Sequence, residues 1–274
     1  MSSRSRQPVV VGTLSVLAFV GLFPYLFMFV ASFKSNEQFN VDYWTPSWPL
    51  HASNYLDAWT QIQPYFVTSI VVAAAAIIGT VALAAVGGFV FARYRFFGRS
   101  FLFGFVAALM MVPGIASLIP LFVLMRDLGL LNTRIVLVLP HIAGGTVLAT
   151  ILMKTFIEQI PQELFDSARV DGAGGVRLFF SIMLPLSLPV IGTVSLLTVI
   201  GVWNDFFWPL LTITEDSLRT VPVGIQFFQG QNVTSWGPLF AGYTLASIPL
   251  LLLFMFLSKW FLAGIQGGLP GTSK

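Results

Sequence analysis

Hydrophobic residues fill six long stretches of this chain, and short segments that are polar or rich in proline and glycine separate them. Each stretch is long enough to cross about 30 Å of hydrocarbon as an α-helix. Backbone groups in lipid must be satisfied within the segment, so stretches of this length are expected to be helices rather than strands. The pattern predicts an all-α polytopic membrane protein with six transmembrane helices near residues 9–32, 66–92, 101–125, 135–156, 186–212 and 239–262.

Composition agrees with this pattern. Charged residues make up 9% of the 274-residue chain and hydrophobic residues 56%, with a mean hydropathy of +0.86. Soluble proteins carry roughly 25% charged residues, so most of this surface is expected to face lipid. We treat residues 1–274 as a single transmembrane domain. Within the third and fourth stretches, Pro113, Gly114, Pro120 and Pro140 are expected to break the helices, either as gates or as packing kinks.

The fourteen lysines and arginines give a topology signal and form no basic face for nucleic acid. With the N-terminus in the cytoplasm, ten of them fall inside and four outside. Cytoplasmic connections carry this excess of positive charge. Both termini and the connection 157–185 are therefore expected in the cytoplasm, and the connections 33–65 and 213–238 outside.

Several kinds of chemistry are missing from the sequence. It has no cysteine and no phosphate-binding loop of the form G-x-x-x-x-G-K-[ST]. It also lacks H-E-x-x-H and G-x-S-x-G. We expect no catalytic site, no metal site and no cofactor on this chain. His141 has no second histidine near it in the sequence, which favours a structural role.

Charge is concentrated between the fourth and fifth stretches, in residues 163–175. Pro161 suits the first position of a helix, and Glu163 suits its first turn. Gly172 stands where a left-handed residue would end that helix. The sequence predicts a short amphipathic helix, a glycine turn and a second helix that leads into the fifth stretch. An apolar, charged and capped surface of this kind is typical of a docking site for another protein.

This segment resembles the EAA loop of ABC importer permeases. The matching residues are Pro161, Glu163-Leu164, Asp166-Ser167-Ala168, Asp171-Gly172-Ala173, Phe179, Leu184-Pro185-Leu186 and Pro189. Asp166-Ser167-Ala168 stands in place of the family's Glu-Ala-Ala and keeps the acidic charge and one alanine. Further likeness to carbohydrate-type permeases, of the maltose "G" and glycerol-phosphate kind, lies in Phe91–Phe96, Met111-Val112-Pro113, Ile119-Pro120-Leu121, Trp203-Asn204-Asp205, Val221–Gly224 and Gly264-x-x-Gly267-Gly268.

The resemblance implies a type I ABC importer permease fold with a cytoplasmic coupling helix, in a multi-pass protein of a bacterial or archaeal inner (plasma) membrane. The coupling residues would be Glu163, Leu164, Phe165, Asp166, Ala168, Arg169, Asp171 and Gly172. The implied partners are a homologous second permease, two cytoplasmic ATPase subunits that bind ATP and Mg²⁺, and an external solute-binding protein. The substrate would be a sugar, such as an oligosaccharide, or a related polyol or glycerol phosphate.

Asp205 is the one acidic residue expected well inside a predicted span. A buried charge there is costly, so it is either part of the translocation path or a structural residue bonded to a neighbouring helix. The possible path residues are Trp203, Asn204, Asp205 and Phe206. The alternative function is an ion-coupled secondary transporter, which would need paired intramembrane ionisable groups and a structural repeat.

Overall fold

The computed structural model describes residues 7–226 and 234–266, with side chains from 10 to 226 and from 234 to 256. Backbone contacts group the chain into two compact units, Met1–Gln63 with Gly224–Pro249, and Pro64–Val223 with Leu250–Lys274. We call them unit 1 and unit 2. The helices α3 (Ser53–Arg93), α12 (Val221–Ile225) and α13 (Trp236–Gln266) contribute residues to both units. Gly267-Gly268, part of the connection 213–238 and several terminal basic residues lie outside the described residues.

Unit 1 contains α1 (Gln7–Ala31) and α2 (Asn36–Val41). Ser35 begins α2 with a capping box, in which its side chain accepts from the Gln38 backbone and the Gln38 side chain accepts from the Ser35 backbone. Asn36 then joins α2 to the segment before α13, since its Nδ2 donates to the Thr234 carbonyl at 3.1 Å and its Oδ1 accepts from the Trp236 N–H at 2.8 Å.

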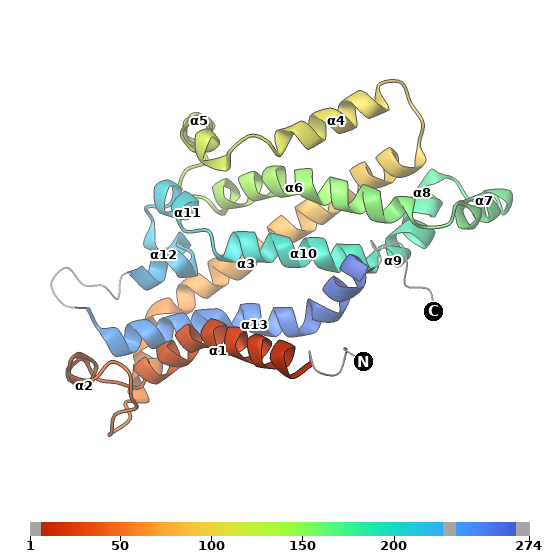
Figure 1. Cartoon of the computed structure of the whole chain (residues 1–274). Coiled ribbons are helices and arrows are strands. Elements are labelled where there is room, and N and C mark those ends of the chain that lie inside the picture. The colour runs from red at the N-terminus through yellow and green to blue at the C-terminus, as the bar shows by residue number, and fades with distance from the viewer. Residues whose placement is uncertain (1–6, 227–233, 267–274) are drawn as a thin grey trace. The chain divides into compact units, whose positions relative to one another are not determined.

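Unit 2 holds the rest of the helices (Figure 1). In chain order after α3 they are α4 (Arg99–Leu109), α5 (Gly114–Asp127), α6 (Arg134–Glu158), α7 (Gln162–Val170), α8 (Gly175–Leu178), the π-helix η1 (Phe179–Met183), α9 (Leu184–Leu186), α10 (Leu188–Trp203), α11 (Phe207–Thr212), the 3₁₀ turn η2 (Asp216–Leu218) and α12 (Val221–Ile225). Figure 1 shows α6 and α10 side by side, and their contacts confirm it.

Close packing of α3 on α6 depends on glycines. A Cβ on Gly88 would lie 2.5 Å from the Cβ of Met153 and 3.0 Å from a backbone nitrogen of α6, and one on Gly79 would collide with Ile142. Only a residue without a side chain fits there. The buried cluster formed around this contact includes Phe89, Met153, Ile157 and Phe165, and so continues into α7.

Four helices are long and apolar enough to cross a membrane: Val10–Ala31, Ser53–Arg93, Arg134–Glu158 and Trp236–Phe256. Two bent pairs pass the same test, Arg99–Leu109 with Gly114–Asp127 at 95° and Gly175–Leu186 with Leu188–Trp203 at 73°. The described chain therefore has four candidate spans, or up to six if each bent pair counts as one.

The stretch 101–125 is interrupted before Gly114, as Pro113 and Gly114 predict. Met110 ends α4 and Pro113 precedes α5, because proline has no N–H and disfavours helical geometry in the residue before it. Pro120 and Pro140, by contrast, lie within continuous helices, so neither proline interrupts its helix. The stretch 186–212 is interrupted at Asn204–Phe206, a position that carries no proline.

The two connections predicted to lie outside, 33–65 and 213–238, contain helical and buried segments. The segment 33–65 includes α2 and the first part of α3, which is amphipathic: Asn54, Ala58 and Ile62 recur every four residues and are buried. The segment 213–226 is not a wholly exposed loop, since Ile213, Val221 and other apolar residues in it are buried. Short amphipathic helices of this kind escape a search for long apolar runs.

Candidate functional site

The charged segment after α6 folds as a helix, a glycine turn and a second helix, as its sequence predicts. Gly172 has φ = +81°, and its N–H donates to the Arg169 carbonyl at 3.0 Å. The Ala173 N–H donates to the Ala168 carbonyl at 2.8 Å. These two bonds form a Schellman motif, which satisfies the last carbonyls of α7 and requires a left-handed residue at Gly172.

Arg93 and Phe165 hold α7 against the end of unit 2. The Arg93 guanidinium donates to the carbonyls of Ile157 and Ile160 and, at 2.8 Å, to Oε1 of Gln162. It also lies 4.3 Å from the centre of the Phe165 ring, a cation–π contact. Phe165 is fully buried. Arg93, at the end of α3, therefore donates to free carbonyls at the end of α6 and also positions the start of α7.

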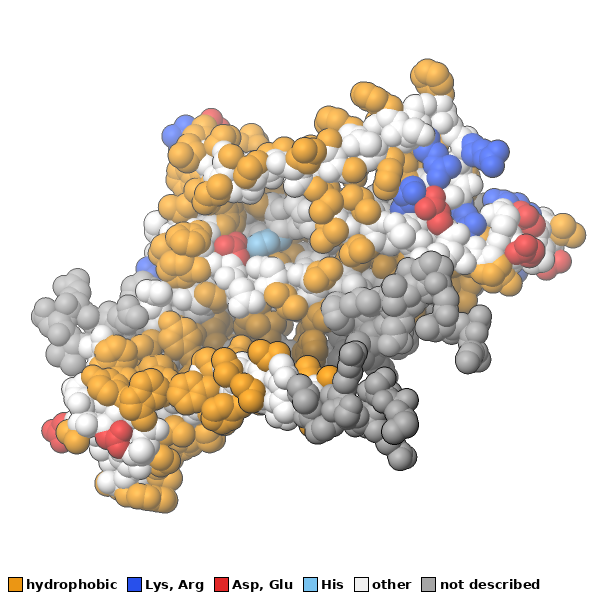
Figure 2. All heavy atoms as spheres, viewed as in Figure 1, with side chains coloured by type: hydrophobic (Ala, Val, Ile, Leu, Met, Phe, Trp, Pro, Cys, Tyr) orange, Lys and Arg blue, Asp and Glu red, His pale blue; other side chains and the backbone are white. Residues whose placement is uncertain are grey.

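Most of the remaining predicted coupling residues are exposed on α7 or in the turn after it, while Ala168 packs against the buried cluster. Glu163, Leu164, Asp166, Arg169, Asp171 and Gly172 are exposed, and Ala168 is half-buried. Asp166 pairs with Arg169 at 2.7 Å and accepts from Gln162 at 3.0 Å. Figure 2 shows charged side chains gathered at the end of unit 2 that carries α7, while hydrophobic side chains cover much of the long helices. The free surface of α7 therefore combines charge with the exposed side chains of Leu164 and Val170.

A second polar site lies at the break between α10 and α11. Nε2 of His141, on α6, is 3.1 Å from Oδ2 of Asp205. The other carboxylate oxygen accepts the backbone N–H of Trp208 at 3.3 Å, so Asp205 also satisfies a free donor at the start of α11. Each side chain of the pair is about one fifth exposed. The sequence analysis gave Asp205 a partner on another helix as one of two alternatives, but did not identify His141 as that partner.

Pro140 explains a further contact between these helices. Because proline lacks an N–H, it leaves the carbonyl of Val136, four residues earlier, without its usual helical donor. The indole Nε1 of Trp208 donates to this carbonyl at 2.8 Å. The Trp208 side chain of α11 thus replaces the hydrogen-bond donor that Pro140 lacks, and α6 remains continuous.

The other possible path residues have different surroundings. Trp203 is 6% exposed and packs edge-on against Phe66, with ring centroids 6.0 Å apart. Asn204 is exposed, and its Nδ2 donates to the Ile200 carbonyl of its own helix. Phe206 is half-buried beside Phe207. The side chain of Asp205, in contrast to that of Asn204, bonds to a residue of another helix.

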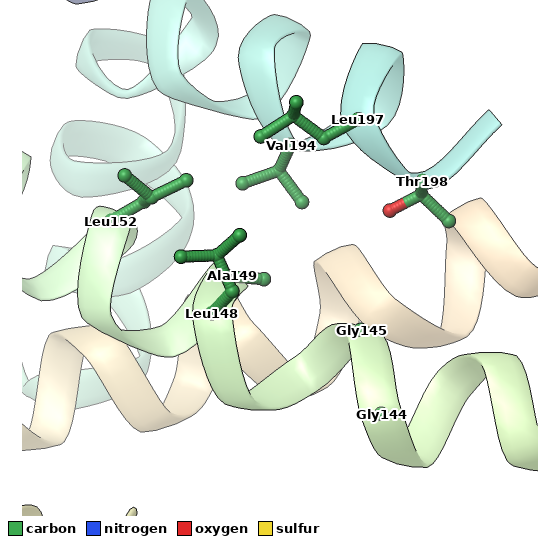
Figure 3. A pocket seen from close by; sticks show the side chains of 8 residues that line it. All are labelled: Gly144, Gly145, Leu148, Ala149, Leu152, Val194, Leu197 and Thr198. Atoms are coloured by element: carbon green, nitrogen blue, oxygen red, sulfur yellow. The ribbon is translucent and has the colours of Figure 1, made fainter. Parts of the chain in front are cut away.

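Two neighbouring cavities lie between α6 and α10, and His141 lines the first of them. One has a volume of about 260 Å³ and is lined by Pro140, His141, Gly144, Gly145, Leu197, Thr198, Gly201 and Val202. The other, of about 160 Å³, shares Gly144, Gly145, Leu197 and Thr198 and continues toward Leu152. Figure 3 shows Ala149 and Leu152 of α6 facing Val194 of α10 across it.

Asn132 was missed by the sequence analysis. It has a positive φ of 55°, its N–H donates to the Thr212 carbonyl, and its Oδ1 accepts from the backbone N–H groups of Thr214 and Glu215 at 2.6 and 3.1 Å. The start of the connection after α11 is thereby fixed to the turn before α6. An asparagine between Leu131 and Thr133 gives no sign of contacts some eighty residues away.

Known proteins resemble this chain over nearly its whole length. It is 32% identical to "Probable ABC transporter permease protein YurM" of Bacillus subtilis, covering 98% of this chain and 92% of that protein. It is 30% identical to "Arabinooligosaccharides transport system permease protein AraQ" of Halalkalibacterium halodurans, covering 98% and 99%. It is also 30% identical to "Trehalose/maltose transport system permease protein MalG" of Thermococcus litoralis, covering 96% of each.

A solved structure has the same fold. It is described as the crystal structure of a bacterial ABC transporter involved in the import of the acidic polysaccharide alginate, with a TM-score of 0.79, 22% identity and coverage of 95% of this chain and 99% of that one. Residues 84–267 match the family described as "Binding-protein-dependent transport system inner membrane component". That match covers more than half of the chain. The chain therefore belongs to the family of inner membrane components of binding-protein-dependent transport systems.

Proposed function

We propose that this chain is a transmembrane subunit of an ATP-driven sugar importer and that α7 transmits the action of a cytoplasmic ATPase to the membrane helices. The observation that carries the proposal is the way α7 is held. Its inner side is fixed by Arg93 and Phe165, its end by the Gly172 turn, and its outer side is free and charged. A push on the outer side would be passed directly to α3 and α6, which Arg93 connects to it.

A sugar is the substrate class that the relatives support. Their names specify arabinooligosaccharides, trehalose and maltose, and maltodextrin. These are neutral, hydroxyl-rich molecules, and an aqueous path for them needs hydrogen-bonding groups rather than fixed charge. A related polyol phosphate belongs to the same proposal, as the sequence likeness to glycerol-phosphate permeases suggested.

The proposed topology has six spans, with each of the two bent helix pairs crossing the membrane as one span. Both termini and α7 lie in the cytoplasm, in agreement with the distribution of lysine and arginine. The connection 213–238 then lies outside, where it would contact a solute-binding protein. The contacts of Asn132 would hold the first residues of that connection in place.

The proposed complex contains a second, homologous permease, two ATPase subunits carrying ATP and Mg²⁺, and the binding protein. An ion-coupled secondary transporter is not favoured, because the family and the relatives belong to binding-protein-dependent systems. The His141–Asp205 pair does not change this, since its groups already have structural partners at the start of α11.

Cross-linking tests the role of α7. The chain has no cysteine, so a single Glu163→Cys substitution gives one reactive site on its exposed surface. In the assembled complex we expect a short bifunctional thiol reagent to link this site to a cysteine-bearing ATPase subunit, more strongly with ATP than without. Val86→Cys, on an exposed position of α3 in a candidate span, is the control and should not be linked. Equal linking of both variants, or none at Glu163→Cys, would reject the proposal.

A further inference from the structure

The glycines of unit 2 fall into two groups. Gly79, Gly88 and Gly145 face side chains of a neighbouring helix, and a Cβ at each would lie within 3.4 Å of another atom. These glycines are explained by close helix packing. Gly144 on α6 and Gly201 on α10 differ, because a Cβ at either position would meet no atom within 4 Å. Glycine destabilises a helix interior relative to alanine, and at these two positions packing does not require it.

Gly104 within α4 is open in the same sense, but Gly144 and Gly201 share one cavity. Gly144 and Gly201 belong to the 260 Å³ cavity beside His141, and Gly144 also lines the adjoining one. The larger cavity, at about 260 Å³, is by itself close to the roughly 300 Å³ at which small-molecule sites begin. The missing side chains leave flat backbone on both helices, a surface against which a ring can lie.

His141 lines this cavity, and both His141 and its partner Asp205 are partly exposed. An ionisable pair facing hydrocarbon is strongly disfavoured, whereas one that faces water or a polar solute is not. The cavity wall between α6 and α10 is therefore suited to an aqueous passage.

The polar end of the cavity also has free bonding capacity. His141 uses Nε2 for Asp205, and no contact to its Nδ1 is found among the described residues. When Nε2 carries the proton, Nδ1 is an acceptor and can take a hydrogen bond from a hydroxyl. Thr198, on the wall of both cavities, adds a hydroxyl that is shown in Figure 3.

We propose that the α6–α10 cavity is a sugar subsite of this subunit, in which a sugar ring lies on Gly144 and Gly201 and a hydroxyl donates to His141 Nδ1. The proposal rests on the proposed function, since it needs a sugar in the path. Asp205 acts in it as a positioning residue, because its carboxylate accepts from Nε2 and so keeps Nδ1 available.

Thiol labelling tests whether the cavity is aqueous. Gly201→Cys in the assembled transporter should react with a charged, water-soluble methanethiosulfonate reagent roughly tenfold faster than Gly21→Cys, which lies on the apolar helix α1. Gly21 is the matched control, because its Cβ would also meet nothing within 4 Å. A sugar taken up by the complex should slow the labelling of Gly201→Cys. Equal slow labelling of both variants would show a lipid-facing surface and overturn the subsite.

Filling the cavity provides the second measurement. Gly144→Leu should raise the KM for uptake of a sugar at least several-fold while the complex assembles normally, and Gly21→Leu should leave KM unchanged. An unchanged KM in Gly144→Leu overturns the subsite. If the wild-type complex transports no sugar with ATP, the proposed function itself fails; wild-type transport without substrate protection at Gly201→Cys rejects the subsite alone.

Discussion

Unit 2 contains two helix interruptions at which the free backbone groups find hydrogen-bond partners in different ways. At Gly172 the chain turns with backbone bonds alone, and the left-handed glycine lets two N–H groups reach the last carbonyls of α7. At Asn204–Phe206 side chains take part: Asp205 accepts from the start of α11, and Trp208 donates to the carbonyl that Pro140 leaves free. The first lies in an exposed segment, and the second in a stretch predicted to cross the membrane.

The difference follows from the surroundings. Water can complete the bonding of an exposed turn, so a glycine with the right backbone angles is sufficient. Within a stretch that crosses the membrane, a freed backbone group away from the aqueous cavity needs a partner from the protein. We therefore expect backbone angles to be decisive at Gly172 and side-chain partners to be decisive at the second break.

The largest effect is expected from Gly172→Val. A β-branched residue at φ = +81° costs about 1–3 kcal/mol, enough to displace the end of α7. Transport per ATP hydrolysed should fall by roughly tenfold, while membrane insertion is retained. Uptake and ATPase activity measured in the same proteoliposomes give this ratio.

Gly174→Val is the matched control for that substitution. Gly174 lies two residues away with φ = −74°, and its Cβ would meet nothing within 4 Å, so valine fits there without strain. A ratio that falls equally in both variants would contradict the role assigned to the left-handed turn.

Asp205→Ala should have the next largest effect. It removes the partner of His141 and the acceptor for the Trp208 N–H, which together are expected to cost about 1–3 kcal/mol. Thermal unfolding in detergent should show a Tm about 2–4 °C lower per kcal/mol lost. Asp127→Ala removes an exposed pair with Arg126 and should leave Tm nearly unchanged. If Tm falls while KM for uptake is unchanged, Asp205 has only a structural role.

A smaller effect is expected from Trp208→Phe, which leaves the Val136 carbonyl without its donor. The expected loss is about 1 kcal/mol. Pro140→Ala restores a backbone N–H to that carbonyl, so the loss from Trp208→Phe should be smaller in the Pro140→Ala background. A double-mutant cycle on the free energy of unfolding measures this coupling. Strict additivity of the two substitutions would show that the indole bond does not replace the missing N–H.

The smallest expected effect is a change in the pKa of Asp42. This aspartate lies outside the candidate spans, and its carboxylate accepts hydrogen bonds within the turn that follows it. The Thr45 hydroxyl donates to its carboxylate, as do the Trp44 and Thr45 N–H groups, and these bonds hold the pKa of Asp42 below its ordinary value of 3.8. A lowered pKa stabilises the fold above the ordinary value, and this contribution is lost as pH falls through the lowered pKa.

Thr45→Val should raise the pKa of Asp42 toward 3.8, because it removes the largest cause of the shift. Carbon-13 NMR titration of the carboxyl group measures it. Thr60→Val is the control, since Thr60 donates to a backbone carbonyl and not to Asp42. An unchanged pKa in Thr45→Val would show that the backbone donors alone account for the shift.

The sequence predicts the segment around Gly172 better than the break at Asn204–Phe206. The amphipathic α7, the turn at Gly172 and the helix after it follow from local signals: a proline, a first-turn acid and a glycine at the right spacing. The structure adds that Phe165 faces inward and that Arg93, some seventy residues earlier, supports the helix.

The break at Asn204–Phe206 depends on contacts between residues far apart in the sequence, which hydrophobic periodicity does not reveal. The proline at position 140 suggested an interruption in α6, yet the interruption lies in the partner stretch after Trp203. The pairing of His141 with Asp205 spans more than sixty residues of sequence. Asn132 and Ser69 likewise bond to the connection after α11 from far away.

The most direct test of the central claim is the energy source for uptake. The complete complex, reconstituted in proteoliposomes with its ATPase subunits and binding protein, should take up a sugar bound by that binding protein only when ATP is supplied. Uptake should stop when the ATPase subunits are omitted. Uptake that proceeds without them, driven by an imposed proton or sodium gradient, would contradict the account.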